Sequence, residues 1–159
     1  MNKRQKGFSL VELLIVVAII LIIVAIAVPD LLKMTMKGRE TSGAASVRQI
    51  INCAVSYQSG HPDIGYPAAG ADMGPAGDGC LDAVLTGALT GGAPKSGYVF
   101  TYAPTNPVGG VNTGFTLTGA PASCDRTGRR TYFADESAVV RFTNAAGCPQ
   151  ADVTSPPLS

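Results

Sequence analysis

KGFSLVELLIVVAIILIIVAIAVP, residues 6–29, is the most distinctive segment of this chain. From Leu13 to Val28 it contains sixteen residues, none charged and none with a side chain that can form a hydrogen bond. One carboxylate, Glu12, stands just ahead of this run. A charged group costs roughly 2.5–3.5 kcal/mol at the centre of a bilayer and less near the interface. An acid in this position therefore predicts a compensating partner.

The composition indicates a helical stem followed by a loop-rich globular part. The chain has 159 residues, of which 19 are Gly and 11 are Pro, and most of these lie after Gly60. With 12 Lys and Arg against 11 Asp and Glu, the net charge is +1, so no strongly basic surface indicates a nucleic-acid partner. Three of the basic residues, Lys3, Arg4 and Lys6, precede the apolar run with no acid among them.

The chain divides into four regions by composition. The apolar segment has 21 residues, which as a helix measures about 31 Å and is long enough to span a bilayer. A basic leader favours the cytoplasmic side, so the C-terminal part is expected outside. The regions are a leader at 1–7, a transmembrane helix at 8–28, an amphipathic stem helix at 29–58 and a globular part at 59–159.

A cleaved secretory signal peptide is the alternative interpretation of the apolar run. AIA at residues 25–27 has the small-residue pattern of a cleavage site. The run is longer than the usual apolar region of such a signal, and a cut there would leave Val28-Pro29 at the new terminus. Both features argue against this alternative.

The N-terminal segment closely resembles that of type IV pilins and type II secretion pseudopilins. That family has a short basic leader ending in glycine, then phenylalanine, then a glutamate fifth after the cut, then an unbroken apolar helix. Gly7, Phe8, Glu12 and the run to Val28 follow this pattern, and Pro29 stands where many members have a helix-kinking proline. The rest of the chain matches only in general plan.

The resemblance implies processing between Gly7 and Phe8. A prepilin peptidase would cut there on the cytoplasmic side, and the new amine of Phe8 would be N-methylated. The methylated amine stays cationic, and Glu12 lies four residues on, about one helical turn away. The two charges would pair within a chain or between neighbours, which favours a fixed register because a misaligned neighbour leaves both unpaired. The alternative is that Glu12 only reaches the lipid headgroups.

The stem is expected to be interrupted and then amphipathic. Pro29 predicts a kink, and Gly38 and Gly43 each weaken a helix by up to ~1 kcal/mol, so residues 29–43 are expected to be flexible or partly melted. Beyond them an apolar face returns and should pack on a sheet. That face consists of Val47, Ile50, Ile51, Ala54 and Tyr57.

The globular part is expected to be an antiparallel meander of about four strands packed on that face. Residues 97–104 alternate in hydrophobicity, 114–119 form a second run, and 129–143 predict two strands around a turn at 134–137. Residues 80–89 predict a short helix, and the final TSPPLS a frayed tail. The fold class is therefore α+β, a long N-terminal helix with an antiparallel sheet, as the pilin resemblance also implies.

Four cysteines predict disulfides rather than a metal site. An even number outside the membrane indicates bridges, and four cysteines allow three pairings. We favour Cys53–Cys80 and Cys124–Cys148, the second closing the C-terminal loop over the last hairpin as in many pilins. Zinc is not expected, because there is no CxxC and one histidine, His61. The acids Asp72, Asp78 and Asp82 surround a loop, but they lack the spacing of a calcium-binding EF-hand.

Neither an enzyme nor a cofactor is expected. No GxSxG frame or phosphate-loop lysine is present. The resemblance implies a structural subunit of a type IV pilus-like filament, built from this chain or with other pilins. Its partners would be the peptidase and N-methyltransferase, membrane lipid and an assembly platform in the bacterial inner membrane, before a cell-surface pilus forms. The alternatives are a pseudopilin in a periplasmic pseudopilus and a tethered binding module without a filament.

Overall fold

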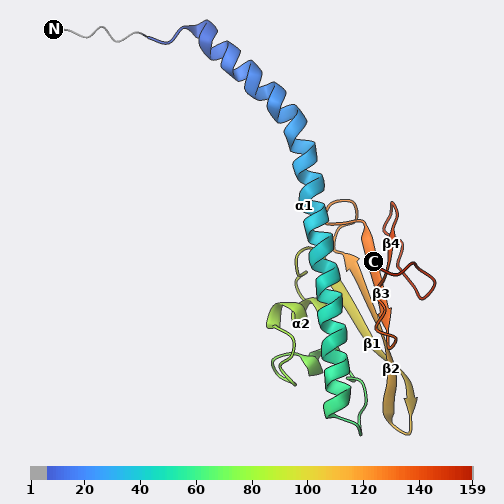
Figure 1. The fold of residues 1–159 in the computed structure, drawn as a ribbon. Helices are drawn as coiled ribbons and strands as arrows, with labels where there is room; N and C mark the ends of the chain where they lie inside the picture. Colours follow the sequence, from blue (N-terminus) through green and yellow to red (C-terminus); the bar gives the residue numbers. More distant parts are fainter. Residues whose placement is uncertain (1–6, 159) are drawn as a thin grey trace, which may run out of the picture. The chain divides into compact units, whose positions relative to one another are not determined.

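The computed structural model describes residues 7–158 and confirms the α+β class (Figure 1). The basic residues of the leader lie outside the described residues. The elements in chain order are α1 (Leu10–Gly60), the 3₁₀ helix η1 (Gly70–Met73), α2 (Ala83–Leu89), β1 (Tyr98–Val108), β2 (Val111–Pro121), β3 (Arg130–Asp135) and β4 (Arg141–Asn144).

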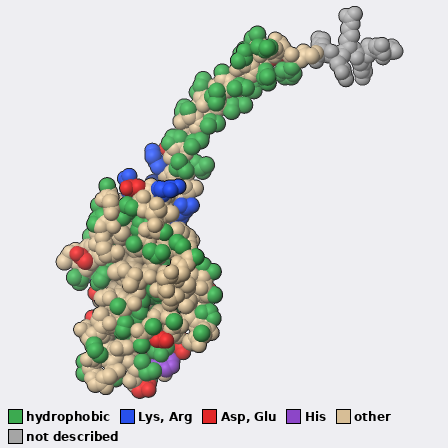
Figure 2. Space-filling model, turned by 180° about the vertical axis from the view of Figure 1, so that it is seen from behind, with side chains coloured by type: hydrophobic (Ala, Val, Ile, Leu, Met, Phe, Trp, Pro, Cys, Tyr) green, Lys and Arg blue, Asp and Glu red, His purple; other side chains and the backbone are tan. Residues whose placement is uncertain are grey.

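Two compact units make up the chain, Met1–Thr35 and Met36–Ser159. We call the second unit the head. Helix α1 contributes to both, so the boundary falls inside the segment that the sequence predicted as one stem, 29–58. Apolar side chains cover the surface of the first unit (Figure 2).

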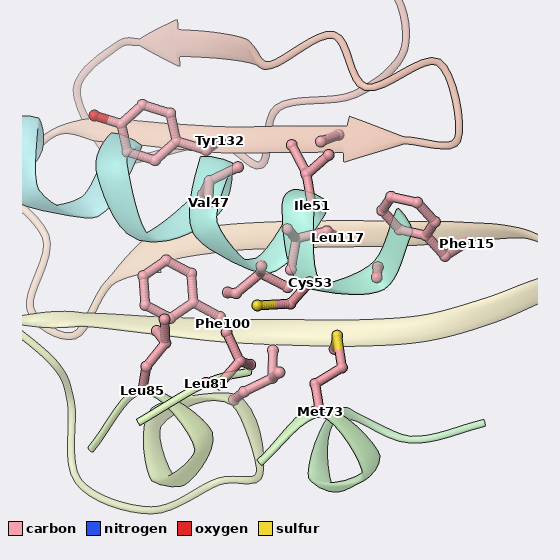
Figure 3. Packing of buried hydrophobic residues seen from close by; sticks show 14 of the residues in the cluster. Val47, Ile51, Cys53, Met73, Leu81, Leu85, Phe100, Phe115, Leu117 and Tyr132 are labelled. Carbon is pink, nitrogen blue, oxygen red and sulfur yellow. The ribbon is translucent and has the colours of Figure 1, made fainter. Parts of the chain in front are cut away.

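The head is a four-stranded antiparallel sheet, in the order β1-β2-β3-β4, with the C-terminal part of α1 packed on one face. The close-up shows Val47 and Ile51 of the helix directed at Phe115 and Leu117 of β2 and Tyr132 of β3 (Figure 3). The predicted helix face is confirmed for Val47, Ile50, Ile51 and Ala54, which are all buried.

The last two strands differ slightly from prediction. β3 continues to Asp135, so the turn that was expected at 134–137 falls at 136–140 instead. The reason is that Ala134 is fully buried opposite Leu117 of β2 and belongs to the sheet. Pairing with β2 thus extends β3 beyond the residues that the local sequence pattern predicts.

The expectation of a partly melted zone at 29–43 is wrong, because this segment is helical throughout. Pro29 lies inside α1 without ending it, and the kink there stays a prediction. Gly43 is buried, and a Cβ atom at this position would lie 3.0 Å from ring carbons of Tyr98. Glycine thus lets the helix approach β1 closely, and this packing offsets its low helix propensity.

A buried acid, Glu40, fastens α1 to the start of β3. Its Oε1 accepts hydrogen bonds from the backbone N–H groups of Arg129, at 2.8 Å, and Arg130, at 3.3 Å. The Arg130 Nε lies 3.6 Å from the other carboxylate oxygen, and the Tyr132 hydroxyl donates to the Glu40 carbonyl at 2.7 Å. Burial raises the pKa of Tyr132 to about 12, with the Glu40 charge acting in the same direction. Tyr132 is therefore a neutral donor at physiological pH.

Glu40→Leu is expected to lower the free energy of unfolding of the head by about 3 kcal/mol, because it leaves two part-buried N–H groups and the charge of Arg130 without their partner. Glu40→Gln is the matched control, since it keeps one carbonyl acceptor, and it should cost clearly less. Denaturant unfolding of the full chain in detergent measures both. Equal stability of Glu40→Leu and the wild type would contradict a fastening role.

The C-terminal tail lies along the edge of β4 through residues 155–158, so the prediction of a frayed TSPPLS is wrong for this part, and Ser159 lies outside the described residues. The N–H of Leu158 donates to the carbonyl of Val140 at 2.7 Å, and the N–H of Phe142 donates to Pro156 at 3.0 Å. Arg141 also donates from Nη1 to the Ser155 carbonyl at 3.0 Å. A proline carbonyl accepts a hydrogen bond, and proline has no N–H group that would itself need an acceptor. Prolines therefore suit a segment that covers a strand edge.

The four cysteines form two bridges in the structure, Cys53–Cys80 and Cys124–Cys148. This is the sequential pairing that the sequence analysis favoured. The first joins the buried face of α1 to the segment ahead of α2, and the second joins the loop after β2 to the chain after β4. The first bridge thus ties a loop-rich segment to a helix, and the second ties two loops together.

Candidate processing and assembly site

The start of α1 is built around Ser9 and Glu12. The backbone N–H of Ser9 donates to Oε2 of Glu12 at 3.0 Å, and the N–H of Val11 donates to Oγ of Ser9 at 3.3 Å. With Leu10 as the first helical residue, Ser9 is the N-cap and Glu12 the third helical residue. This is a capping box, in which serine and glutamate satisfy backbone donors that have no partner inside the helix.

The capping box is a role for Glu12 that the sequence analysis missed. The signal was present, because Ser-x-x-Glu ahead of an apolar run is a known pattern for a helix start. A carboxylate has two oxygens and about four lone-pair sites. The bond from Ser9 therefore leaves Glu12 able to accept from a second donor.

The Gly7–Phe8 peptide bond lies outside the helix in an open position. Gly7, Phe8 and Ser9 have no regular secondary structure, and the Phe8 side chain is 83% exposed. No atom of the described chain beyond its neighbours lies within 4 Å of a Cβ built on Gly7. In the uncut chain the nitrogen of Phe8 is a neutral amide, so an ion pair with Glu12 requires cleavage first.

The helix after Glu12 exposes its apolar surface on all sides. The side chains from Leu13 to Val28 are exposed without interruption. Among residues 7–158, α1 is the helix that is long and apolar enough to cross a membrane. Such a surface needs a cover of lipid or of other helices.

Two of the three acids that were weighed as calcium ligands, Asp72 and Asp82, have structural roles. Asp72 accepts from the N–H of Ala69 at 2.8 Å, and Asp82 caps α2 through the N–H of Leu85 at 2.8 Å. Lys95 pairs with Asp82 at 2.8 Å, and this hydrogen bond holds the pKa of the Asp82 carboxyl below its usual value. Within residues 7–158, no group of three or more His, Cys, Asp or Glu is placed to hold a metal ion.

A folded α+β head that follows one exposed apolar helix, with an acid at the helix start, fits a membrane-anchored protein. Residues 2–28 match the family model described as the prokaryotic N-terminal methylation motif. This range includes the Gly7–Phe8 junction, Glu12 and the apolar run up to Val28.

Two curated proteins are similar to part of the chain. The type IV major pilin protein PilA of Myxococcus xanthus is 36% identical over 58 residues, which cover 36% of this chain and 26% of that protein. The type IV wide pilus major component PilA4 of Thermus thermophilus is 38% identical over 56 residues, covering 35% of this chain and 43% of the relative. The chain thus matches less than half the length of either relative, and no solved structure gives a significant match.

The motif and the two relatives show that the N-terminal segment of this chain is similar to that of type IV pilins.

Proposed function

We propose that this chain is a subunit of a type IV pilus-like filament, released for assembly by cleavage between Gly7 and Phe8 and by N-methylation of Phe8. The observation that carries the proposal is the methylation motif at residues 2–28, which coincides with an apolar helix exposed on all sides and precedes a folded head. An apolar surface of this kind suits exchange of lipid for the helices of neighbouring subunits.

The proposed chemistry depends on Glu12. Cleavage turns the Phe8 nitrogen into an amine that stays cationic after methylation, within reach of a carboxylate one helical turn away. The capping bond from Ser9 uses one oxygen of Glu12, so the other can accept from the amine of an incoming chain. In an apolar environment a misplaced subunit would leave both charges unpaired, and the pair therefore selects one register.

The proposed route begins in the inner membrane, with the basic leader in the cytoplasm and the head outside. This orientation follows from the leader charge, and the two disulfides of the head agree with an oxidising compartment. The proposed partners are the peptidase with its N-methyltransferase, an inner-membrane assembly platform, lipid, and further copies of this chain or other pilins. The role of the chain itself is structural and not catalytic.

The mature chain is expected to begin at Phe8, without residues 1–7 and with one added methyl group. Intact mass and N-terminal sequencing of the membrane and surface fractions measure this. Gly7→Val is expected to keep the leader attached and the chain in the inner membrane. Gly7 leaves the cleavage position open, and a branched side chain there would obstruct the peptidase. A mature chain that begins at Val28, or an uncut chain, would refute the proposal.

Imaging of the cell surface then separates the two filament types. Surface fibres that contain this chain, and that disappear when it is deleted, are the expected result. If no fibre is lost but secreted enzymes stay inside the cell, the chain acts as a pseudopilin in protein export.

A further inference from the structure

One end of the head carries cations without partners. Lys37 and Arg39 lie on the first turns of α1 within the head. Arg126 lies on the loop 122–129 between β2 and β3, and Thr127 of this loop and Arg39 both approach Gly97. This loop is held there by the bond of its last residue to Glu40. Within the described chain, Lys37, Arg39 and Arg126 form no ion pair with a carboxylate. We call these three residues the basic end.

Two arginines next to the basic end already have acidic partners. Arg129 pairs with Asp125, and Arg130 lies 3.6 Å from Glu40. The basic end thus keeps an excess of three positive charges. Figure 2 shows Lys and Arg side chains gathered where α1 enters the head, with some acidic side chains beside them, and it shows the histidine with further acidic side chains toward the opposite end, where no Lys or Arg is seen in this view.

The opposite end of the head carries an excess of acids, Asp63, Asp72 and Asp78, which we call the acidic end. Burial raises the pKa of the hydroxyl of Tyr57, in the last turn of α1, and the charges of these three carboxylates act in the same direction. His61 stacks on Tyr57 and lies 3.8 Å from Asp78.

The position of the acidic end is unfavourable within a single subunit. The C-terminal end of a helix carries partial negative charge and favours cations nearby, yet the last turn of α1 has no basic residue. Acids are gathered where the helix disfavours them, so complementary charge from outside the subunit would stabilise this end.

The two ends lie on the same helix at a fixed spacing. Lys37 and Tyr57 are twenty residues apart, which corresponds to roughly 30 Å along the helix axis. A second copy that lies parallel to the first and is displaced by about this length would bring its basic end against the acidic end of the first.

We propose that the acidic end of one subunit docks on the basic end of another parallel copy of this chain, displaced along the helix axis. The inference rests on the proposed filament function and adds a second contact, outside the membrane, to the one at Glu12. Complementary ends also discourage side-by-side alignment without an offset, because that arrangement places like charges together.

The contact is expected to set register and rate more than strength. Exposed ion pairs contribute little individually, and salt screens them over about 8 Å at physiological ionic strength. Three facing pairs act together, and steering by complementary surfaces raises association rates at low salt. Assembly is therefore expected to be sensitive to charge reversal at either end.

A charge-swap experiment on the full chain tests the inference. One variant carries Lys37→Glu and Arg126→Glu, and a second carries Asp63→Lys and Asp78→Lys. These side chains are all exposed. Asp72 is left unchanged because it caps η1. A third variant carries all four substitutions, so that its ends are again complementary with reversed signs.

Each two-site variant is expected to lower surface fibre yield at least about fivefold, while cleavage and both disulfides stay normal. The four-site variant is expected to recover most of the wild-type yield. Co-expression of the two defective chains is also expected to restore fibres, since one then has two acidic ends and the other two basic ends.

Three outcomes would overturn the inference. Two-site variants that assemble like the wild type would show that the ends do not meet. A four-site variant as defective as Lys37→Glu with Arg126→Glu would indicate that the basic end binds anionic lipid headgroups instead. If the wild-type chain itself forms no fibre, the filament function falls together with the inference. If the wild-type chain forms fibres but the four-site variant does not recover them, the inference is wrong and the filament function stands.

Discussion

Glu12→Gln is expected to reduce fibre assembly at least about a hundredfold, while the chain is still inserted, cleaved and oxidised. Glutamine keeps the shape of the side chain and still suits the third position of a capping box, so the helix start with Ser9 remains. What is lost is the negative charge. The cationic amine of an incoming Phe8 would then enter the apolar environment without its counter-ion, and an unpaired buried charge costs about 3–5 kcal/mol.

Two further variants separate docking from capping. Glu12→Val removes both the charge and the cap, should improve membrane insertion slightly, and should assemble no better than Glu12→Gln. Ser9→Ala is the matched control, because it removes the hydroxyl that accepts from Val11 but keeps the carboxylate. It is expected to assemble nearly as well as the wild type. Fibre yield relative to membrane-held chain measures all three, with cleavage followed on the same blot. Normal assembly of Glu12→Gln and Glu12→Val would show that Glu12 has no docking role.

Replacing both Cys53 and Cys80 by alanine is expected to lower the free energy of unfolding of the head by about 3.5 kcal/mol. The bridge closes a loop with a sequence separation of 27, and the chain-entropy estimate for such a loop has this size. Single domains are stable by about 5–15 kcal/mol, so the loss is a large share. The head should unfold at a lower denaturant concentration and be degraded more readily in cells.

The second bridge provides the comparison for this experiment. Cys124–Cys148 has a sequence separation of 24, so its entropic contribution is almost the same. Cys53, however, is buried against the sheet, and removal of its sulfur also loses packing in the core. The Cys53 and Cys80 variant should therefore be the less stable of the two. Tyrosine fluorescence can follow unfolding, because the chain has no tryptophan. An unchanged unfolding midpoint would contradict the constraint that we assign to the bridge.

Local periodicity explains why most of the head was predictable from the sequence. The alternation of Tyr98, Phe100 and Tyr102 corresponds to one face of β1, and the helical spacing of Val47, Ile50 and Ile51 corresponds to the face of α1 that meets the sheet. Such patterns follow from strand and helix geometry alone. The motif around Gly7, Phe8 and Glu12 is equally local and could be read without a structure.

Contacts between distant segments explain what the sequence analysis missed. The sequence analysis did not single out Glu40, because its partner Arg129 is 89 positions away. Gly43 was expected to weaken the helix, whereas the ring of Tyr98 against it gives the glycine a packing role. The proline-rich tail has no strand-like alternation, and its place beside β4 depends on free donors of that strand.

On the proposed route across the membrane, the tail that covers β4 would also impose an order on folding. Residues 155–158 emerge after the strand they cover, so the edge of β4 stays open until then. Cys80 emerges well before Cys124 and Cys148, and the first bridge can therefore form while the sheet is still incomplete. Open strand edges pair readily with other chains. On that route, each head would pass through an interval in which α1 is already anchored by its bridge but the last strand is unprotected. Neighbouring chains would be most prone to associate wrongly during this interval.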